Sequence, residues 1–504
     1  MILPQPPLPV ESGEGWTGNA SIPQWNFFGP DKFDVFHLRA LFYLVTPKEV
    51  ANLTGPNHNL SYAEEAHHVQ DVFSDTIPVF MVLCLIEAVV SFIVTGRLFP
   101  VSDTITSWSA GLLSHMTKIC VKTLDVGLYT WLFTHYRLTI IPIDTWWAWA
   151  AALLATDFGY YWFHRASHEI NLFWAAHQVH HSSEEFNFSV ALRQSVVSNF
   201  GAWVFYLPMA LLGFTPATFL IHHQLNLLYQ FWIHTSLIKN LGPLEWILNT
   251  PSHHRAHHGR NPLYIDINYG GVLIIWDRLF GTFIPENEKE PALYGLVGRL
   301  ESHNAVWVQV LRLAEIRRRI AANTSLGDKI SAALKGPRWR PGLPFFGLLD
   351  RTIPIAKKEE HPERKYQSKV PRWQKIYATI HFLTVMPWFL AMLRGYENHE
   401  PYSTSETLLT FVHMTISLAN IGSVFDGRSW IPLTETARCA FLFLFFNFLP
   451  GLEDEYEYMR SIMRTVLLLS VFLWPVRHYL TTTSAHAATP ANGPSVVTKV
   501  EKSK

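Results

Sequence analysis

The sequence predicts an all-α, multi-span integral membrane protein with a histidine-rich metal site, and three observations support this fold class. Of the 504 residues, 49% are hydrophobic and only 16% are charged, and the 19 tryptophans and 18 tyrosines are typical of chains that seat aromatic rings near lipid headgroups. Apolar stretches of spanning length recur, whereas the alternating pattern of strands is scarce. Twelve of the 25 histidines fall between His164 and His258. The net charge of zero gives no reason to expect nucleic acid as a partner.

The first two parts of the chain are expected to differ in polarity. Residues 1–75 are expected to be a polar, partly disordered region, because they open with several prolines and a Gly/Ser stretch. Residues 76–283 are expected to form a membrane-embedded catalytic domain. In it, residues 76–94 are the plainest span, interrupted only by Glu87, and residues 138–161 are another. Residues 194–238 contain no Asp, Glu, Lys or Arg, so we expect them to cross and return, turning at Pro208 and at residues 213–216.

The rest of the chain is expected to alternate between water and membrane. Residues 284–374 are charged and are expected to form a cytosolic segment, partly packed on the membrane surface. Residues 375–480 are expected to form C-terminal transmembrane helices, with candidate spans at residues 376–392, 408–424, 439–449 and 466–476. Residues 481–504 are rich in Thr, Ser, Ala and Pro and are expected to be a disordered tail. About five to eight spans follow for the whole chain.

Eight of the twelve crowded histidines form three tight groups. The groups are His164-Arg-Ala-Ser-His168, His177-Gln-Val-His180-His181 and His254-Arg-Ala-His257-His258. An even spread would place about five histidines in this window, so composition alone does not explain twelve. Within each group the spacing is i, i+4 or i, i+3, i+4, and such positions share one face of a helix. The spacing therefore predicts that each group directs two or three imidazoles at one point, as a helix presents ligands to a metal.

The number of groups favours a functional site with two ions. One such group alone is more often a set of surface histidines or an adventitious metal patch, but three groups of matching spacing on a membrane scaffold are not. Imidazole suits iron, zinc and copper, and the absence of cysteine from the groups argues against a structural zinc site. Eight or more nitrogens are enough for two ions of four to six ligands each. Two redox-active ions with open positions are what O2 activation needs, so we favour a non-haem diiron site.

Several polar neighbours are candidates for supporting roles. Asp157 precedes His164 by two helical turns, and Glu169 directly follows His168, so both are candidate catalytic carboxylates that can take the second N–H of a ligand imidazole. A solvated helix end is an equally good interpretation of Glu169. His234 lies inside the charge-free run, and an intramembrane histidine is a candidate functional residue. Two further histidines are candidates for contacting the ligands from outside, or for ending helices: His222 and His253.

These residues resemble the integral-membrane fatty acid hydroxylase superfamily, whose pattern is HxxxH or HxxxxH followed by two HxxHH boxes. The resemblance covers residues 156–283 and includes Asn268-Tyr-Gly-Gly271 and Ile275-Trp-Asp-Arg-Leu-Phe-Gly-Thr282 after the third box. It implies a cytosol-facing diiron centre. It also implies the ligands His164, His168, His177, His180, His181, His254, His257 and His258, with His234 at an additional family ligand position. Some relatives have one more histidine where this chain has Gln230, so the exact ligand number stays open.

Within the superfamily, the chain resembles the alkylglycerol monooxygenases. The likeness lies in Asp157-Phe-Gly-Tyr-Tyr-Trp-Phe-His-Arg165, in Ala191-Leu-Arg-Gln-Ser195 and in Leu227-Leu-Tyr-Gln-Phe-Trp-Ile-His-Thr235, and the long C-terminal run of apolar helices is similar too. The resemblance implies a multi-pass enzyme of the endoplasmic reticulum membrane that uses two iron ions, O2 and tetrahydrobiopterin, with an external system that recycles the pterin. It also implies hydroxylation of the ether-bearing carbon of a 1-alkylglycerol lipid, whose hemiacetal falls apart to fatty aldehyde and glycerol.

Two other functions remain open on the residues alone. The sequence has no His-Pro-Gly-Gly haem signature and no GxGxxG motif after a strand, so the reductant is expected to be external. A sterol or fatty-acid hydroxylase or desaturase would use the same diiron core with a separate electron carrier. A membrane metal transporter would also carry histidines, but transport sites tend to bear carboxylates and to be spread along a path. The crowding of the histidines into one window disfavours the transporter.

Overall fold

The structure is a computed structural model that describes residues 30–54, 61–347, 365–397, 404–445 and 457–487. These residues form α-helices and short 3-10 helices and contain no β-strand, and their one isolated β-bridge joins Leu248 and Leu273. The predicted all-α class is therefore confirmed for the described part of the chain. Of the regions expected to be disordered in whole or in part, residues 1–75 and 481–504, the segments 1–29, 55–60 and 488–504 lie outside the described residues, whereas residues 481–487 are helical.

Part of the N-terminal region is folded against the helices that follow it. Capping boxes, in which a hydroxyl and a glutamate satisfy each other's backbone N–H groups, begin α2 at Thr46 and α3 at Ser61. The Tyr43 hydroxyl lies 2.8 Å from Nδ1 of His222, which fastens this region to α11. The short helices here are α1 (Val35–Ala40), α2 (Pro47–Asn52), α3 (Tyr62–His68) and α4 (Val72–Asp75).

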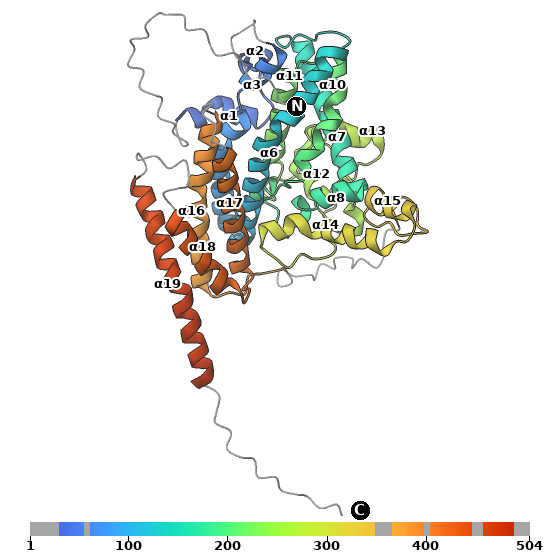
Figure 1. The fold of residues 1–504 in the computed structure, drawn as a ribbon. Helices are drawn as coiled ribbons and strands as arrows, with labels where there is room; N and C mark the ends of the chain where they lie inside the picture. The colour runs from blue at the N-terminus through green and yellow to red at the C-terminus, as the bar shows by residue number, and fades with distance from the viewer. Residues whose placement is uncertain (1–29, 55–60, 348–364, 398–403, 446–456, 488–504) are drawn as a thin grey trace, which may run out of the picture.

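Three long helices follow and build the scaffold of the histidine site. They are α5 (Ile77–Thr95), α6 (Val101–Tyr136) and α7 (Trp146–Glu169). α5 ends at Gly96, whose φ of 69° is the left-handed conformation that favours glycine at a helix end. In Figure 1, α6 runs between α7 on one side and the C-terminal helices of residues 372–487 on the other. Helix α6 thus packs both against helices of the part of the chain that carries the clustered histidines and against the C-terminal helices.

The membrane assignment is supported by length, composition and outward-facing side chains. Among the described residues, four helical stretches are long and apolar enough to cross a membrane: Tyr62–Thr95, Arg372–Leu393, Ser405–Phe425 and Tyr458–Arg477. On α5, Leu85, Ile93 and Val94 are each more than 60% exposed, as expected for residues that face lipid rather than water. The chain is therefore described as a multi-pass membrane protein.

Four candidate spans are fewer than the five to eight that the sequence predicts. The α7 stretch is not among the four, and it buries Asp157 and two of the clustered histidines instead of presenting an apolar surface all round. The charge-free run of residues 194–238 does not form two full-length spans. It contains short 3-10 turns, α10 (Leu207–Leu212) and α11 (Pro216–Trp232), because Pro208 and the left-handed Gly213 confine α10 to six residues. The candidate span at residues 439–449 is described only to residue 445.

The second half of the chain contributes two further groups of helices, α14 with α15 and the C-terminal helices. α14 (Ala305–Ala322) and α15 (Leu326–Leu334) lie along the lower edge in Figure 1. The C-terminal helices pack side by side beside α6, with a core that includes Phe389, Met414 and Leu418. These helices are α16 (Arg372–Glu397), α17 (Thr404–Phe425), α18 (Ile431–Phe445) and α19 (Glu457–Ala487).

Candidate metal centre

The clustered histidines lie at the ends of helices, where the local spacing brings them together. His164 and His168 occupy the last turns of α7, and the short α8 (Asn171–His177) ends in a third histidine. The second box continues into a 3-10 helix, η2 (His180–Ser182). The third box forms α12 (Pro251–His257) and its cap, and His234 lies just beyond the end of α11. The first and third boxes are therefore α-helical, as the i, i+4 spacing predicts, whereas the second is divided between the end of α8, a turn and η2.

The structure brings together all nine histidines for which we predict a ligand role, in two buried clusters. In each cluster, one ring nitrogen per residue lies within 4.8 Å of those of all the other members. The five-histidine cluster contains His164, His168, His177, His181 and His257, and the four-histidine cluster contains His180, His234, His254 and His258. Each cluster draws on more than one histidine box, so the boxes form one joint site with two centres.

Ring nitrogens within each cluster approach one another closely. Nε2 of His177 lies 2.9 Å from Nε2 of His164 and 3.1 Å from Nε2 of His181. In the other cluster, Nε2 of His254 lies 2.9 Å from Nε2 of His234 and 3.2 Å from Nε2 of His258. Nitrogens that converge in this way share one small volume, and a cation in that volume satisfies all their lone pairs at once.

Burial favours the neutral form of several of these imidazoles, which is the form that binds a metal. It lowers the pKa of His180 to about 4, and it lowers the pKa of His181 and His258 well below the usual value. Nε2 of His168 and Nε2 of His257 are buried and have no hydrogen-bond partner. Nine imidazoles exceed the four to six ligands of one ion, so these residues fit a pair of ions with a preference for nitrogen ligands.

Hydrogen bonds on the outer side of the rings fix which nitrogen faces inward. Nδ1 of His164 lies 2.8 Å from the carbonyl oxygen of Tyr269, and Nδ1 of His257 lies 2.7 Å from that of Ile267. Nδ1 of His234 lies 2.7 Å from the carbonyl oxygen of its own helix at Gln230. A carbonyl oxygen only accepts, so each Nδ1 donates and each Nε2 keeps its lone pair for the centre.

Asp266 is a carboxylate of this site that the sequence pattern does not indicate. Its Oδ1 lies 3.5 Å from Nδ1 of His168, and its Oδ2 accepts a hydrogen bond of 2.9 Å from Arg338. The φ of Asp266 is 61°, a left-handed conformation that is uncommon outside glycine. Asp266 follows the third box by eight residues and Arg338 comes from a later segment, so only the fold brings them to His168.

The two predicted carboxylates lie elsewhere. Asp157 accepts from the backbone N–H groups of Val272 and Leu273 at 2.8 and 2.9 Å, and from the side chains of Asn226 and Trp276 at 2.8 and 3.0 Å. It therefore fastens the loop that carries the carbonyl partner of His164, and it contacts no clustered imidazole. Glu169 forms an ion pair of 2.9 Å with Arg165. Catalytic roles for Asp157 and Glu169 stay predictions.

The two additional histidines stand outside both clusters. His222 faces Tyr43, as described above. Nε2 of His253 lies 3.7 Å from a carboxylate oxygen of Glu245, which also accepts hydrogen bonds from Thr250 and Ser252 at the start of α12. His253 and its partner therefore support the helix that carries the third box rather than joining its ligands.

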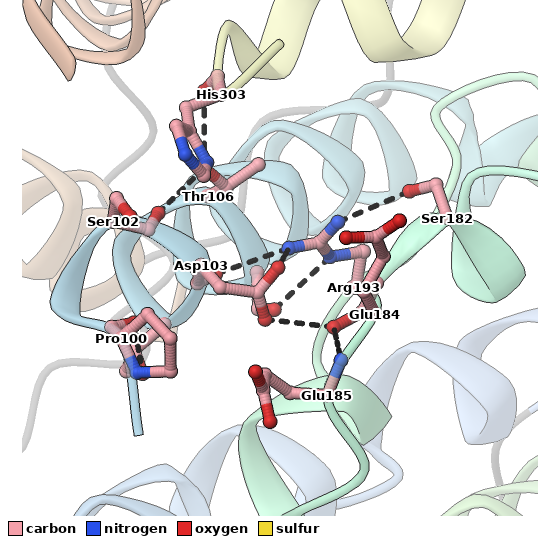
Figure 2. A network of polar contacts seen from close by, with 12 residues as sticks. Pro100, Ser102, Asp103, Thr106, Ser182, Glu184, Glu185, Arg193 and His303 are labelled. Atoms are coloured by element: carbon pink, nitrogen blue, oxygen red, sulfur yellow. Dashed lines mark hydrogen bonds and ion pairs between the residues drawn. The ribbon is translucent and has the colours of Figure 1, made fainter. Parts of the chain in front are cut away.

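A polar network holds the loop that follows the second box (Figure 2). Arg193 donates to Asp103 at 2.6 Å, to Ser107 at 3.0 Å and to the hydroxyl of Ser182 at 3.1 Å. Its backbone carbonyl oxygen lies 3.3 Å from Nδ1 of His180. Figure 2 shows the Arg193 side chain between Asp103 and Ser182. The motif around Arg193 thus links α6 to a member of the four-histidine cluster.

Glu87, the residue that interrupts the first span, also faces the site. It accepts a hydrogen bond of 2.5 Å from the hydroxyl of Thr235 and one of 2.7 Å from the backbone of Phe188. Thr235 directly follows His234 in the chain. The carboxylate is 2% exposed, and a buried intramembrane carboxylate commonly serves a functional site. The sequence marks Glu87 only as an exception in an apolar stretch.

A mainly apolar cavity of about 210 Å³ leads to the four-histidine cluster. Its wall includes Trp108, Phe231 and Phe389, and His234 and Gln230 also line it, together with other polar side chains such as Lys118 and Asn199. A mainly apolar cavity with polar groups in its wall fits a ligand with a hydrocarbon chain and a small polar part.

Comparison with known proteins places this chain among membrane lipid enzymes. The fatty acid hydroxylase family model matches residues 149–282, and the model for the alkylglycerol monooxygenase C-terminal domain matches residues 374–465. The chain is 39% identical to a Xenopus tropicalis protein named alkylglycerol monooxygenase over 87% of its own length and 94% of the relative. A human protein of the same name is 40% identical, over 84% and 92%, and one from Danio rerio is 38% identical, over 87% and 94%. No solved structure matches the chain.

Proposed function

The chain belongs to the alkylglycerol monooxygenase family, and on that premise we propose that it is a tetrahydrobiopterin-dependent, non-haem diiron monooxygenase of 1-alkylglycerols. Membership already makes it an oxidoreductase of the fatty acid hydroxylase type with histidine-rich clusters that suggest iron. The pterin, the two irons and the ether-lipid substrate are the proposed parts. The two irons are supported by one observation above all, namely that nine imidazoles converge in two clusters, and the pterin and the substrate follow from membership of the family.

The proposed reaction inserts one oxygen atom into the C–H bond next to the ether oxygen. The second oxygen atom of O2 leaves as water, and the tetrahydropterin supplies the two electrons and two protons that this requires. The product is a hemiacetal, which splits into a fatty aldehyde and glycerol. Iron bound to the two clusters would supply the redox chemistry that activates O2.

The protein's own residues hold the ligands and exclude water. The five-histidine cluster would hold one ion and the four-histidine cluster the other. The outer hydrogen bonds from His164, His257 and His234 to carbonyl oxygens keep the Nε2 atoms of these three residues directed at their centres without rotation of the ring. The alkyl chain would lie along the aromatic wall of the cavity, which limits access of water to the reacting carbon.

We further propose that the centre faces the cytosol from the membrane of the endoplasmic reticulum. The histidine boxes lie at helix ends, next to the charged region around α14 and α15, which supports a position near an aqueous surface. A cytosolic face would give a water-soluble pterin and its external recycling system access to the enzyme. In this arrangement the lipid enters from the membrane and the reductant from water.

Product analysis tests the proposal most simply. Membranes containing the full chain are supplied with a 1-O-alkylglycerol and O2, with and without tetrahydrobiopterin, and the fatty aldehyde is measured. We expect aldehyde only with the pterin, and none from a His257→Ala control. A stable alcohol or alkene formed with a separate electron carrier would instead support a sterol or fatty-acid hydroxylase or desaturase. Metal uptake into vesicles without oxidation would support a transporter.

A further inference from the structure

Gln230 stands at the point where the apolar cavity meets the four-histidine cluster. It lines the cavity together with His234, which lies four residues later in the chain. Its backbone oxygen accepts from Nδ1 of His234 at 2.7 Å, so its position relative to that imidazole is fixed. Its side-chain amide is therefore next to the place where a substrate carbon would react.

A chain of hydrogen bonds determines which way this amide points. Both side-chain oxygens of Asp157 accept hydrogen bonds from groups that can only donate. These groups are the backbone N–H groups of Val272 and Leu273 and the indole N–H of Trp276. Asn226 also donates to Asp157, through its NH2 group at 2.8 Å, and this turns the carbonyl oxygen of its side chain toward Gln230.

The same logic orients the Gln230 side chain. Its Nε2 donates to the carbonyl oxygen of Asn226 at 2.7 Å, which leaves Oε1 as the remaining group of the amide. In the part of the chain that the structure describes, no hydrogen bond reaches this oxygen. The hydrogen bonds from Gln230 to Asn226 and from Asn226 to Asp157, here called the relay, thus hold the Gln230 amide in place and leave its Oε1 as an acceptor without a donor.

We propose that Oε1 of Gln230 accepts a hydrogen bond from a glycerol hydroxyl group of the substrate, and so recognises the polar part of the lipid beside the metal centre. This inference rests on the proposed function. An ether oxygen and the methylene next to it are not hydrogen-bond donors, whereas the glycerol hydroxyl groups are. The acceptor therefore distinguishes a glycerol ether from other lipids of similar chain length. An analogue without the hydroxyl leaves the acceptor unpaired, and sites built in this way discriminate strongly against such analogues.

The test compares two substrates in a variant without the acceptor. The substrates are a 1-O-hexadecylglycerol and hexadecyl propyl ether, which has hydrogen in place of both hydroxyls, and the readout is kcat/KM for release of hexadecanal. We expect Gln230→Met to lower kcat/KM for the glycerol ether by about tenfold to a hundredfold and to change that for the propyl ether by less than about twofold. The preference for the glycerol ether would then collapse.

A further variant separates the acceptor from general effects on the cavity. Gln194→Met removes another glutamine of the cavity wall, one whose amide donates to the Ala191 carbonyl oxygen outside the relay, and it should leave the preference unchanged. Iron content per chain, measured for every variant, reports whether the centre is intact.

The outcomes distinguish this inference from the proposed function. If the wild-type enzyme releases no aldehyde from the glycerol ether, the proposed function fails. If the wild type does so but Gln230→Met keeps the wild-type preference, only the role of Gln230 is overturned. Equal loss of preference in Gln230→Met and Gln194→Met would also contradict it.

Discussion

The molecule contains two kinds of buried polar cluster, and their difference shows what makes a metal site. In the C-terminal helices, ligand atoms of His381, Glu435 and Cys439 lie as close together as those of the histidine clusters. That cluster, however, already has a cation inside it. Arg438 donates to both oxygens of Glu435 and lies 2.8 Å from Nδ1 of His381. The guanidinium group occupies the place that an ion would take.

The hydrogen-bonding capacity of the two regions differs in the same sense. Glu435 also accepts bonds of 2.8 Å from Tyr377 and 3.1 Å from Asn420, so the C-terminal cluster is satisfied within the protein. In the histidine clusters, by contrast, Nε2 of His168 and Nε2 of His257 have no partner. The presence of ligand-type residues is thus not sufficient for a metal site. The residues must also lack an internal cation, and their lone pairs must converge on one volume.

The strongest test of this contrast removes one member from each histidine cluster. His257→Ala and His258→Ala should each reduce aldehyde formation to background. The first would remove a ligand from the five-histidine cluster and the second from the four-histidine cluster, and neighbouring imidazoles would be held less firmly. Iron per purified chain should fall in both variants, while the amount of chain in the membrane stays as in wild type. Full turnover in either variant would remove that histidine from the ligand set.

The next test breaks the C-terminal cluster. Glu435→Ala leaves the Arg438 charge buried without its partner, and loss of one member of a buried pair costs about 3–5 kcal/mol of stability. We expect a clearly lower unfolding temperature in detergent with unchanged iron per folded chain. A loss of bound metal without a loss of stability would show that the C-terminal cluster, too, is a metal site.

A smaller effect is expected from the partner of His168. Asp266→Asn removes the carboxylate charge 3.5 Å from Nδ1 of this imidazole, and loss of such outer partners typically reduces metal affinity by about tenfold to a hundredfold. Competition with an iron chelator measures the change. Glu169→Gln is the matched control, since Glu169 pairs with Arg165 rather than with a clustered ring. Equal losses in the two variants would contradict the assignment of Asp266.

The smallest effect is expected one step further out, at the network of Figure 2. Asp103→Asn weakens the hold on Arg193, whose carbonyl oxygen orients His180. Because it acts through another residue, we expect a loss of activity of less than about tenfold, with iron lost faster from the four-histidine cluster than from the other. Spectroscopic signals of the two irons would reveal the asymmetry, and a symmetric loss would argue against this path.

The sequence predicts the local parts of the site well and the long-range parts poorly. The grouping of the clustered histidines follows from spacing, because i, i+4 positions share a helix face whatever the surrounding fold. The contacts of His168 with Asp266 and of Thr235 with Glu87 join segments that are far apart in the chain, so no local pattern marks them. Asp157 illustrates the limit: its spacing suggests an imidazole partner, but backbone N–H groups of a distant loop fill its oxygens first.

The described residues contain four candidate spans, against the five to eight expected for the whole chain, and one part of the difference has a related physical reason. Composition reports how apolar a stretch is, but not whether its helix continues, and Gly213 ends α10 inside a run that contains no charge. The fold class depends on the sum of many apolar stretches and is robust to such local breaks.

Metal analysis of the purified wild-type chain, combined with Mössbauer spectroscopy, tests the central claim most directly. If the two histidine clusters form one joint centre, the protein should retain about two iron ions per chain, and their spectra should show a magnetically coupled pair. Zinc as the only metal after expression in iron-replete cells, or a single uncoupled iron per chain, would contradict it.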